Sequence, residues 1–435
     1  MSIGSDQLAY QEEGRLTAQQ SVSVVLIMVC LYMFLVIERP WESIRYLEGL
    51  RIERVYAILL IIVAILHHAF RVVPSPLNKW VYGLLTLHFV LAPFAFNTDY
   101  ALDQGIEYAK MAVLYLLMLS IADDEITLKT IVKAYVFSTM LYVLHSFWEY
   151  TNGRHVWRMG ISRMMGVDST FNDPNSFGAT VVLSLPFVYA LLRSEQNRHL
   201  RKLYYLYGAF AILCVVLTGS RTSFVALLAL CAIWVLVQKG KRKLLILCAT
   251  IVAMTVVWHI MPEEKQERFR TLWDEEAGPK NARESAEGRI QGWKASWRMF
   301  QQRPFTGVGA GGKNYIGYRM THHVDDGAPS PNQSHILYGE VLAELGLFGA
   351  VLFVGLMVSI LRCCHRVRSR LSTGGCIDDT FSFYLAGAII VALILLLVFG
   401  IGGHNFYRPL WLWLAAWSGG LLTVAACPAS EQHVM

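Results

Sequence analysis

The sequence predicts an all-α, polytopic membrane protein of about 12 transmembrane helices, with one large periplasmic loop between spans 9 and 10. The first observation behind this prediction is composition: 55% of the 435 residues are hydrophobic and only 16% are charged, outside the usual range of soluble domains. The second is length. Apolar runs of about sixteen to twenty residues recur along most of the chain, and a run of that length crosses roughly 30 Å of hydrocarbon.

The predicted spans follow one another through short polar loops, apart from one long interruption. They lie near residues 21–37, 55–70, 80–96, 106–121, 131–150, 174–192, 203–217, 223–237, 244–261, 347–362, 382–400 and 408–426. The polar start of the chain, with no cleavage site after the first apolar run, predicts no cleaved signal peptide. The expected parts are a cytoplasmic N-terminal tail (1–20), spans 1 to 9 (21–261), a periplasmic loop with amphipathic helices (262–346), spans 10 to 12 (347–426) and a cytoplasmic C-terminal tail (427–435).

Basic residues set the expected orientation. Residues 193–202, 239–243 and 362–370 each hold four Lys or Arg, and in a protein of twelve spans all three loops share the side of the N-terminus. The positive-inside rule makes that side cytoplasmic. Residues 38–54 also hold four Arg but fall outside, against the rule. Membrane proteins carry Lys and Arg to fix their orientation, so the net charge of +6 is explained without a nucleic-acid partner, and membrane lipids are the expected surroundings.

Cysteine placement agrees with this orientation. All eight cysteines fall in spans or on the cytoplasmic side, and none falls in an outer loop, where a free thiol would meet an oxidising compartment. They are Cys30, Cys214, Cys231, Cys248, Cys363, Cys364, Cys376 and Cys427.

The long interruption at 262–334 changes character along its length. It opens with acidic residues such as Asp274, Glu275 and Glu276, whereas residues 288–320 hold six Lys or Arg and no carboxylate. Apolar and aromatic residues at helical spacing predict an amphipathic helix over 284–302, which lies along the membrane surface and ends at Pro304. A glycine-rich turn should follow at 307–312, and a second helix should begin near 332–334 and continue through Glu344. The basic surface is either a contact for lipid headgroups or a cradle for an anionic, lipid-linked substrate.

Three residues in or near this outer region are candidates for chemistry. Arg221, in Gly-Ser-Arg-Thr-Ser, stands between two short apolar runs near the outer hydrocarbon boundary, where a charge is costly unless paired. Its guanidinium either binds phosphate or simply extends to the membrane–water interface without a functional role. Arg289 begins the basic helix and could supply the second cation that a pyrophosphate needs, or be a plain surface charge. His335, before the returning helix, is either a general base or an inert outer histidine.

Two other patterns are interpreted as having no cofactor role. Residues 307–314 fit G-x-G-x-x-G and nearly fit a phosphate-binding loop, but such loops need a strand before and a helix after in a cytoplasmic domain. A plain turn is expected instead. A metal could be bound by the pair His322-His323 with the pair Asp325-Asp326, but the sequence offers no clear third ligand group beside these two pairs. The D-x-D motif, by which sugar-nucleotide transferases usually bind a divalent cation, does not occur in the chain. No metal and no cofactor are expected.

An ordered set of motifs now points to a family. Phe171–Phe177 (FNDPNSF), Gly219–Ser223 (GSRTS), Gly288–Trp293 (GRIQGW), Arg303–Gly309 (RPFTGVG) and Ser334–Gly346 (SHILYGEVLAELG) together resemble the O-antigen ligase and polymerase superfamily of bacterial inner membranes. The resemblance covers about residues 165–350. In many ligases an asparagine follows the histidine, but Ile336 stands there in this chain.

The resemblance implies a function. Members move a glycan from undecaprenyl pyrophosphate to an acceptor hydroxyl on the periplasmic side, without a metal, and the acceptor is lipid A–core, another lipid-linked glycan or a protein. The matching positions give catalytic roles to Arg221, Arg289 and His335. Substrate binding is expected of the loop residues Arg298, Lys313, Asn332 and Tyr338.

Ligation to lipid A–core is the leading expectation, with polymerisation or protein O-glycosylation as alternatives within the superfamily. A lipid-linked glycan flippase is the alternative from another class. It would need polar groups across the bilayer midplane and paired repeats, whereas only His67, His68 and His145 were identified as histidines within spans and no repeat is visible. A membrane scaffold without enzymatic activity is the remaining possibility.

Overall fold

The computed structural model describes residues 24–43, 47, 52–158, 161–168, 172–238, 240–270, 280–373 and 381–426. Both predicted tails lie outside the described residues. So do Cys376, Cys427, Phe171 and the acidic residues Asp274, Glu275 and Glu276.

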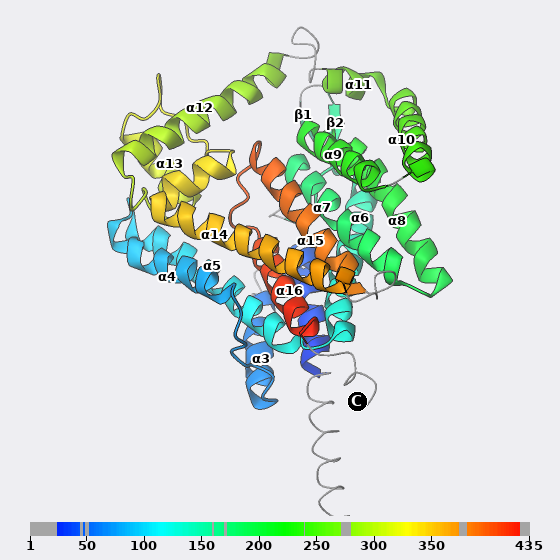
Figure 1. The fold of residues 1–435 in the computed structure, drawn as a ribbon. Helices are drawn as coiled ribbons and strands as arrows, with labels where there is room; N and C mark the ends of the chain where they lie inside the picture. Colours follow the sequence, from blue (N-terminus) through cyan, green and yellow to red (C-terminus); the bar gives the residue numbers. More distant parts are fainter. Residues whose placement is uncertain are drawn as a thin grey trace, which may run out of the picture.

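The described chain is almost entirely helical, as expected (Figure 1). After the first helix, Val24–Glu42, the principal helices are α3 (Ile52–Leu66), α4 (Asn78–Leu91), α5 (Thr98–Ile121), α6 (Glu125–Thr151), α7 (Pro174–Ser194), α8 (Arg198–Thr218), α9 (Arg221–Val237), α10 (Gly240–Ile260), α11 (Glu263–Arg270), α12 (Lys280–Gln302), α13 (Gly312–Thr321), α14 (Leu337–Thr373), α15 (Phe381–Gly400) and α16 (Leu410–Val424). Short helical segments are α2 (Pro40–Ser43) and η2 (Ala92–Phe94).

The prediction of a membrane protein is confirmed. Within the described ranges, 7 helices are long and apolar enough to cross a membrane, and α9 and α16 are shorter apolar helices. Each of the predicted apolar runs overlaps a helix. The chain is therefore a multi-pass membrane protein, while the full count of 12 crossings stays a prediction.

The bundle has a buried centre and a lipid-like outer surface. Helix α7 packs against α8 and α15, and α14 packs against α4, α15 and α16. The large side chains of Trp417 and Phe187 are completely enclosed in this core. At the periphery, α10 exposes Leu244, Leu245 and Ile251, which is the surface expected of a helix that faces hydrocarbon.

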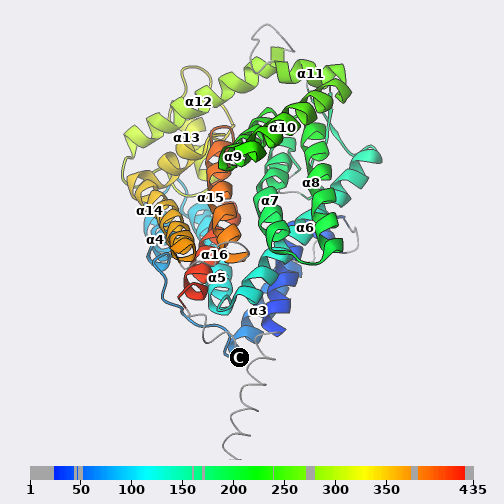
Figure 2. The same ribbon diagram turned by 45° about the vertical axis from the view of Figure 1, so that its right-hand side comes forward.

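The long interruption between α10 and α14 folds over one end of the bundle. In Figures 1 and 2, α11 and α12 lie at the end away from α3, and α13 lies between α12 and α14. The predicted amphipathic helix is present as α12, which ends at Gln302, two residues before Pro304. Its exposed face carries Trp293 and Trp297.

A small sheet qualifies the all-α prediction. Strands β1 (Val156–Arg158) and β2 (Ile161–Arg163) pair antiparallel, with Val156 opposite Arg163. The two strands are too short for an alternation of apolar and polar residues to be recognised in the sequence. The function of the sheet in the fold is local: it brings Arg163 to the end of α8, as described below.

The start of the second outer helix was wrongly predicted. It begins at Leu337, not near 332–334. The reason lies in the backbone: His335 has φ 51°, in the left-handed region, which a right-handed helix cannot include. The helix then runs through Glu344 and kinks at Gly346, where φ is 63°.

The prediction of histidines within spans also needs correction. Helix α3 ends at Leu66, so His67 and His68 follow its end. His145 does lie within α6, 2.5 Å from Glu38. His88, which the sequence analysis overlooked, is buried in α4 and stacks on Tyr108 with ring centroids 4.6 Å apart.

Candidate active site

The Gly-Ser-Arg-Thr-Ser motif forms the turn between α8 and α9. Gly219 ends α8 with φ 57°, a conformation that glycine adopts without a steric penalty. Ser220 then caps α9, and its hydroxyl accepts a hydrogen bond from the Ser223 N–H at 3.3 Å. Arg221 is consequently the first residue of α9 and is half-buried. The motif thus sets the position of Arg221 through two helix ends.

Three buried cations hold the last carbonyls of α8. Lys265 Nζ donates to Leu217 O at 3.2 Å, Arg163 Nε to Thr218 O at 2.7 Å and Arg268 Nε to Gly219 O at 2.6 Å. Positive charge at a helix C-terminus is favourable, because the helix dipole is negative there. Burial, together with the positive charge of Arg163, lowers the pKa of Lys265 to about 8. These contacts fix the turn that carries Arg221, and the sequence analysis did not identify them.

The start of α7 approaches the same turn. Asp173 caps α7 by accepting hydrogen bonds from the N–H groups of Asn175 and Ser176 at 2.9 and 3.0 Å. Arg163 Nη2 donates to Asn175 Oδ1 at 3.1 Å. Gly178 lets α7 and α9 come close, since a Cβ there would lie 2.5 Å from Ser223 Oγ. Residues 172–177 of the FNDPNSF motif therefore belong to this site.

Arg289 lies within electrostatic range of Arg221. Burial lowers the pKa of Arg289, the positive charge of Arg221 lowers it further, and the carboxylate of Asp173 raises it. Both the Arg289 guanidinium and Thr222 Oγ1 lie against Gly402: a Cβ at Gly402 would lie 3.3 Å from Arg289 Cζ and 3.2 Å from Thr222 Oγ1. Two arginines far apart in the sequence are thereby brought together.

His335 lies in the segment just before α14. Helix α12 packs closely on this segment, since a Cβ at Gly292 would lie 2.4 Å from Ser334 O. The hydroxyls of Ser296 and Ser334 are 2.9 Å apart. A left-handed backbone at a residue other than glycine is strained and is often found at functional positions. The ring of His335 lies beside that of His404, with centroids 5.2 Å apart at 50°.

His404 belongs to the loop 401–409 between α15 and α16. Glu344 Oε2 accepts from the Tyr407 hydroxyl and from the Gly311 N–H, both at 2.7 Å. Glu340 Oε2 accepts from the Phe406 N–H at 3.1 Å. The two glutamates of α14 thus hold this loop.

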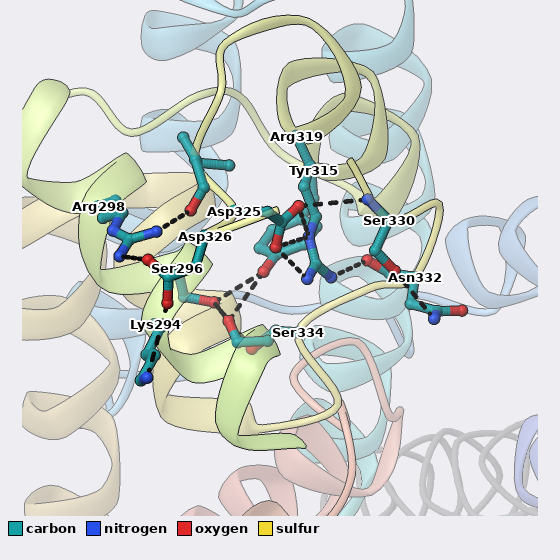
Figure 3. Close-up of polar contacts among 12 residues, drawn as sticks. Lys294, Ser296, Arg298, Tyr315, Arg319, Asp325, Asp326, Ser330, Asn332 and Ser334 are labelled. Carbon is teal, nitrogen blue, oxygen red and sulfur yellow. Dashed lines mark hydrogen bonds and ion pairs between the residues drawn. The ribbon is translucent and has the colours of Figure 1, made fainter. Parts of the chain in front are cut away.

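The predicted substrate-binding residue Arg298 lies in an ion-pair network of the loop 322–334 (Figure 3). Its guanidinium pairs with Asp326 and donates to Val324 O at 2.9 Å. Beside it, buried Arg319 grips Asp325 through Nε and Nη2 and donates to Asn332 O at 2.8 Å. These contacts give Arg298 a structural task, and substrate binding by it stays a prediction.

The other predicted substrate-binding residues are spread over the outer segment. Lys313 Nζ lies 5.1 Å above the ring of Tyr100. Asn332 is exposed and donates to Ser330 Oγ at 3.0 Å. The Tyr338 hydroxyl donates to Leu397 O at 3.1 Å. None of these contacts brings the three together, so their role as one binding surface remains untested.

The glycine-rich turn and the His/Asp cluster are both engaged by protein groups. The Gly311 N–H, at the start of α13, donates to the Glu344 carboxylate, so a protein anion occupies the place where a phosphate loop would hold its ligand. The element directly before this turn in the described chain is helix α12, where a phosphate-binding loop would have a strand. Asp325 and Asp326 are bound by arginines, and His322 stacks on Tyr318 with centroids 3.8 Å apart. The described residues contain no group of three or more His, Cys, Asp or Glu arranged for a metal ion.

A cavity borders the loop 401–409 on the side of α5 and α16. Its volume is about 220 Å³, and Tyr407 and Arg408 line it where it meets the loop. Its remaining lining combines apolar side chains, such as those of Met111, Leu114 and Trp413, with charged ones. The charged lining residues are Arg39, Glu53, Glu107 and Lys110. Arg408 also donates to Thr180 Oγ1 and Ser176 O, which ties the loop to α7.

Together, these elements place Arg289 against the loop 401–409, His335 beside His404 of that loop, and Arg221 within electrostatic range of Arg289. The arrangement can bind a group with more than one negative charge and can accept a proton nearby. Comparison with known proteins agrees with the motifs: residues 206–354 match the O-antigen ligase family. This segment contains Arg221, Arg289 and His335, and the predicted resemblance to the superfamily is confirmed. No curated protein matches the chain.

Proposed function

We propose that this member of the O-antigen ligase and polymerase superfamily is an inverting, metal-independent glycosyltransferase of the bacterial inner membrane. It transfers a glycan from undecaprenyl pyrophosphate to an acceptor hydroxyl at the periplasmic face, and the acceptor is lipid A–core. The observation that carries the proposal is that Arg289 and His335 both lie against the loop 401–409, while Arg221 lies within electrostatic range of Arg289.

The two arginines suit a pyrophosphate leaving group. Burial lowers the pKa of Arg289 most, and the positive charge of Arg221 adds to this shift. An anion with several charges between the two guanidinium groups would favour their charged forms. Guanidinium groups grip phosphate through two parallel hydrogen bonds. Fixed positive charge of this kind stabilises the negative charge that develops on the leaving pyrophosphate. The arginines would therefore bind the donor and promote departure of its lipid carrier.

His335 suits the acceptor side of the reaction. Its imidazole takes the proton of the acceptor hydroxyl while that oxygen bonds to the anomeric carbon. The bond from the anomeric carbon to the pyrophosphate oxygen breaks in the same step, and its electron pair leaves with undecaprenyl pyrophosphate. A single displacement inverts the anomeric centre.

The membrane setting serves a donor and an acceptor that are both lipids. The cavity lined by Tyr407 and Arg408 also has apolar walls, formed in part by Met111, Leu114 and Trp413, against which part of a lipid chain would pack next to the loop of the site. The surrounding helices expose apolar side chains, so a lipid tail can stay in the bilayer while its head group reaches the site.

A reconstituted transfer assay tests the proposal. Purified protein in lipid vesicles receives an undecaprenyl-pyrophosphate-linked glycan and lipid A–core, with excess EDTA, and mass spectrometry identifies the products. We expect glycan joined to lipid A–core with inverted anomeric configuration. A longer lipid-linked glycan would indicate a polymerase instead, and glycan on an added acceptor protein would indicate an O-oligosaccharyltransferase. Movement of the donor between leaflets without any transfer would indicate a flippase, and activity restored only by a divalent metal would refute metal independence.

A further inference from the structure

The cavity beside the loop 401–409 changes from polar to apolar along the wall that α5 forms. Gln104, Glu107 and Lys110 line it first, and Met111 and Leu114 line it further along the helix. A helix rises by about 1.5 Å per residue, so the step from Gln104 to Leu114 covers about 15 Å of this wall. The wall is therefore long enough to have a polar end and a separate apolar end.

The wall formed by α16 changes in the same direction. Tyr407 and Arg408 line the cavity where the loop enters α16, and Trp413 lines it further along that helix. The polar ends of the two walls lie together at Gly311. A Cβ at Gly311 would lie 3.0 Å from Gln104 Oε1, and the Gly311 N–H donates to the Tyr407 hydroxyl at 3.1 Å. The cavity is consequently polar next to the loop and apolar within the bundle.

The size of the cavity suits one hydrocarbon chain. Val36 and Ile37 of the first helix add to its apolar lining, and its volume is about 220 Å³. For comparison, an apolar cavity of about 150 Å³ binds one benzene molecule. The space therefore takes a segment of a single chain, while the rest of a lipid has to lie outside it.

Charges of both signs lie at the polar end of the cavity. Lys110 pairs with Glu107 at 2.5 Å, and Arg39 pairs with Glu42 at 3.1 Å. This pairing leaves little net positive charge for a pyrophosphate. Carboxylate groups and the amide of Gln104, in contrast, can form hydrogen bonds with sugar hydroxyls. The polar end thus suits a sugar head group better than a pyrophosphate.

The loop 401–409 connects this cavity with the candidate active site. Gly402 lies against Arg289, whereas Tyr407 lines the cavity. His404 lies between these two residues in the sequence, and its ring centroid is 5.2 Å from that of His335. A head group that extends from the polar end of the cavity along the loop therefore comes to the segment of the predicted base.

We propose that the cavity binds the acceptor lipid: one hydrocarbon chain packs against the apolar walls, and the sugar head group lies along the loop with its reacting hydroxyl at His335. This inference rests on the proposed function. The donor is assigned elsewhere, because Arg221 and Arg289 lie in the segment that matches the family, residues 206–354. All residues that line the cavity lie outside this segment. The two lipid substrates would thus be bound by different parts of the chain.

Filling the cavity tests the proposal by kinetics. Met111→Trp enlarges a half-buried side chain of the apolar wall. Ile106→Trp is the matched control, since Ile106 lies on the same helix, is 50% exposed and does not line the cavity. We expect Met111→Trp to raise the KM for lipid A–core about tenfold, as overpacking does, with kcat and donor binding close to wild type. Ile106→Trp should match wild type in all three.

Cross-linking identifies the bound lipid and does not depend on turnover or on the Trp variant. A photoreactive diazirine amino acid replaces Met111 or, as the control, Ile106. The protein is reconstituted in vesicles of phosphatidylethanolamine and phosphatidylglycerol that contain lipid A–core and the undecaprenyl-pyrophosphate-linked glycan. After irradiation, mass spectrometry identifies the attached lipid. We expect lipid A–core at position 111 and phospholipid at position 106.

The outcomes separate this inference from the proposed function. Attachment of the lipid-linked donor or of phospholipid alone at position 111 would overturn the acceptor site, as would an unchanged KM for lipid A–core in Met111→Trp. The proposed function would still stand if wild type transfers glycan. If lipid A–core attaches at position 111 but wild type transfers no glycan to it, the cavity binds that lipid and the proposed function fails.

Discussion

Gly402 lies directly against the guanidinium of Arg289, and a Cβ at this position would lie 3.3 Å from Arg289 Cζ. The loop 401–409 therefore limits where the second cation of the site can lie. Its neighbour Gly403 provides a matched comparison, because a Cβ there would meet only Phe399 O, at 3.4 Å. Neither glycine has a positive φ, so alanine introduces no backbone strain at either position.

This pair gives the first prediction. Gly402→Ala should displace Arg289 and lower the transfer rate by about tenfold, since crowding a packed site costs about 1–3 kcal/mol. Gly403→Ala should leave the rate unchanged. The comparison is made by single-turnover transfer with saturating acceptor. Equal rates for the two variants would mean that Arg289 does not need its position against the loop.

The arginines themselves give the second prediction. Arg221→Ala and Arg289→Ala should each weaken donor binding by about 10- to 100-fold, because a hydrogen bond to a charged group contributes about 1.5–3 kcal/mol. Arg221→Lys should recover only part of this loss, since an ammonium cannot make the two-pronged contact. Binding is measured with a labelled lipid-linked glycan. Lys294→Ala is the control on α12, where Lys294 Nζ lies 3.6 Å from a carboxylate oxygen of the exposed Asp326. Normal donor binding by both arginine variants would contradict their assignment.

The backbone of His335 gives the third prediction. Left-handed φ costs about 1–2 kcal/mol for a residue with a Cβ, and more for a β-branched one. His335→Gly should therefore match or exceed wild type in thermal stability, whereas His335→Val should be less stable than either. His323 has the same φ of 51° and should show the same order of stabilities. Transfer should be lost only at position 335. A variant His335→Gly that unfolds would argue that the histidine serves stability.

Lys265 gives the fourth prediction, on pH. Its pKa in the folded protein is about 8, below the ordinary value near 10.4. Between these two values the unfolded chain holds the extra proton, so the stability contributed by this group rises as pH rises from about 8 to 10. Relative to Lys265→Met, wild type should gain roughly 2 kcal/mol over that range. Thermal unfolding in detergent at a series of pH values measures this, and a difference that stays constant with pH would contradict it.

The helices were predictable because the bilayer imposes one length scale on the sequence. Apolar runs such as 382–400 and 174–192 return as α15 and α7 with ends shifted by only a few residues. The amphipathic period around Trp293 and Trp297 likewise predicted α12. These features depend on neighbouring residues along the chain, and local patterns carry them.

The site was predictable only where a motif marked it. Arg221, Arg289 and His335 stand in motifs, but the contacts that assemble them come from residues without a local pattern. Arg163 is brought to the site by a pair of three-residue strands, and Gly402 and His404 are brought there by the loop after α15. The late start of α14 follows from the φ of His335, a tertiary strain that helix propensity does not encode.

The measurement that tests the account most directly compares donor binding with the single-turnover rate in His335→Ala, with His323→Ala as control. If His335 is the base, His335→Ala should bind the lipid-linked donor nearly as wild type does and transfer its glycan about 10²–10⁴-fold more slowly. His323→Ala should match wild type in both. A His335→Ala protein that folds, binds donor and transfers glycan at close to the wild-type rate would contradict the account, because the base would then lie elsewhere.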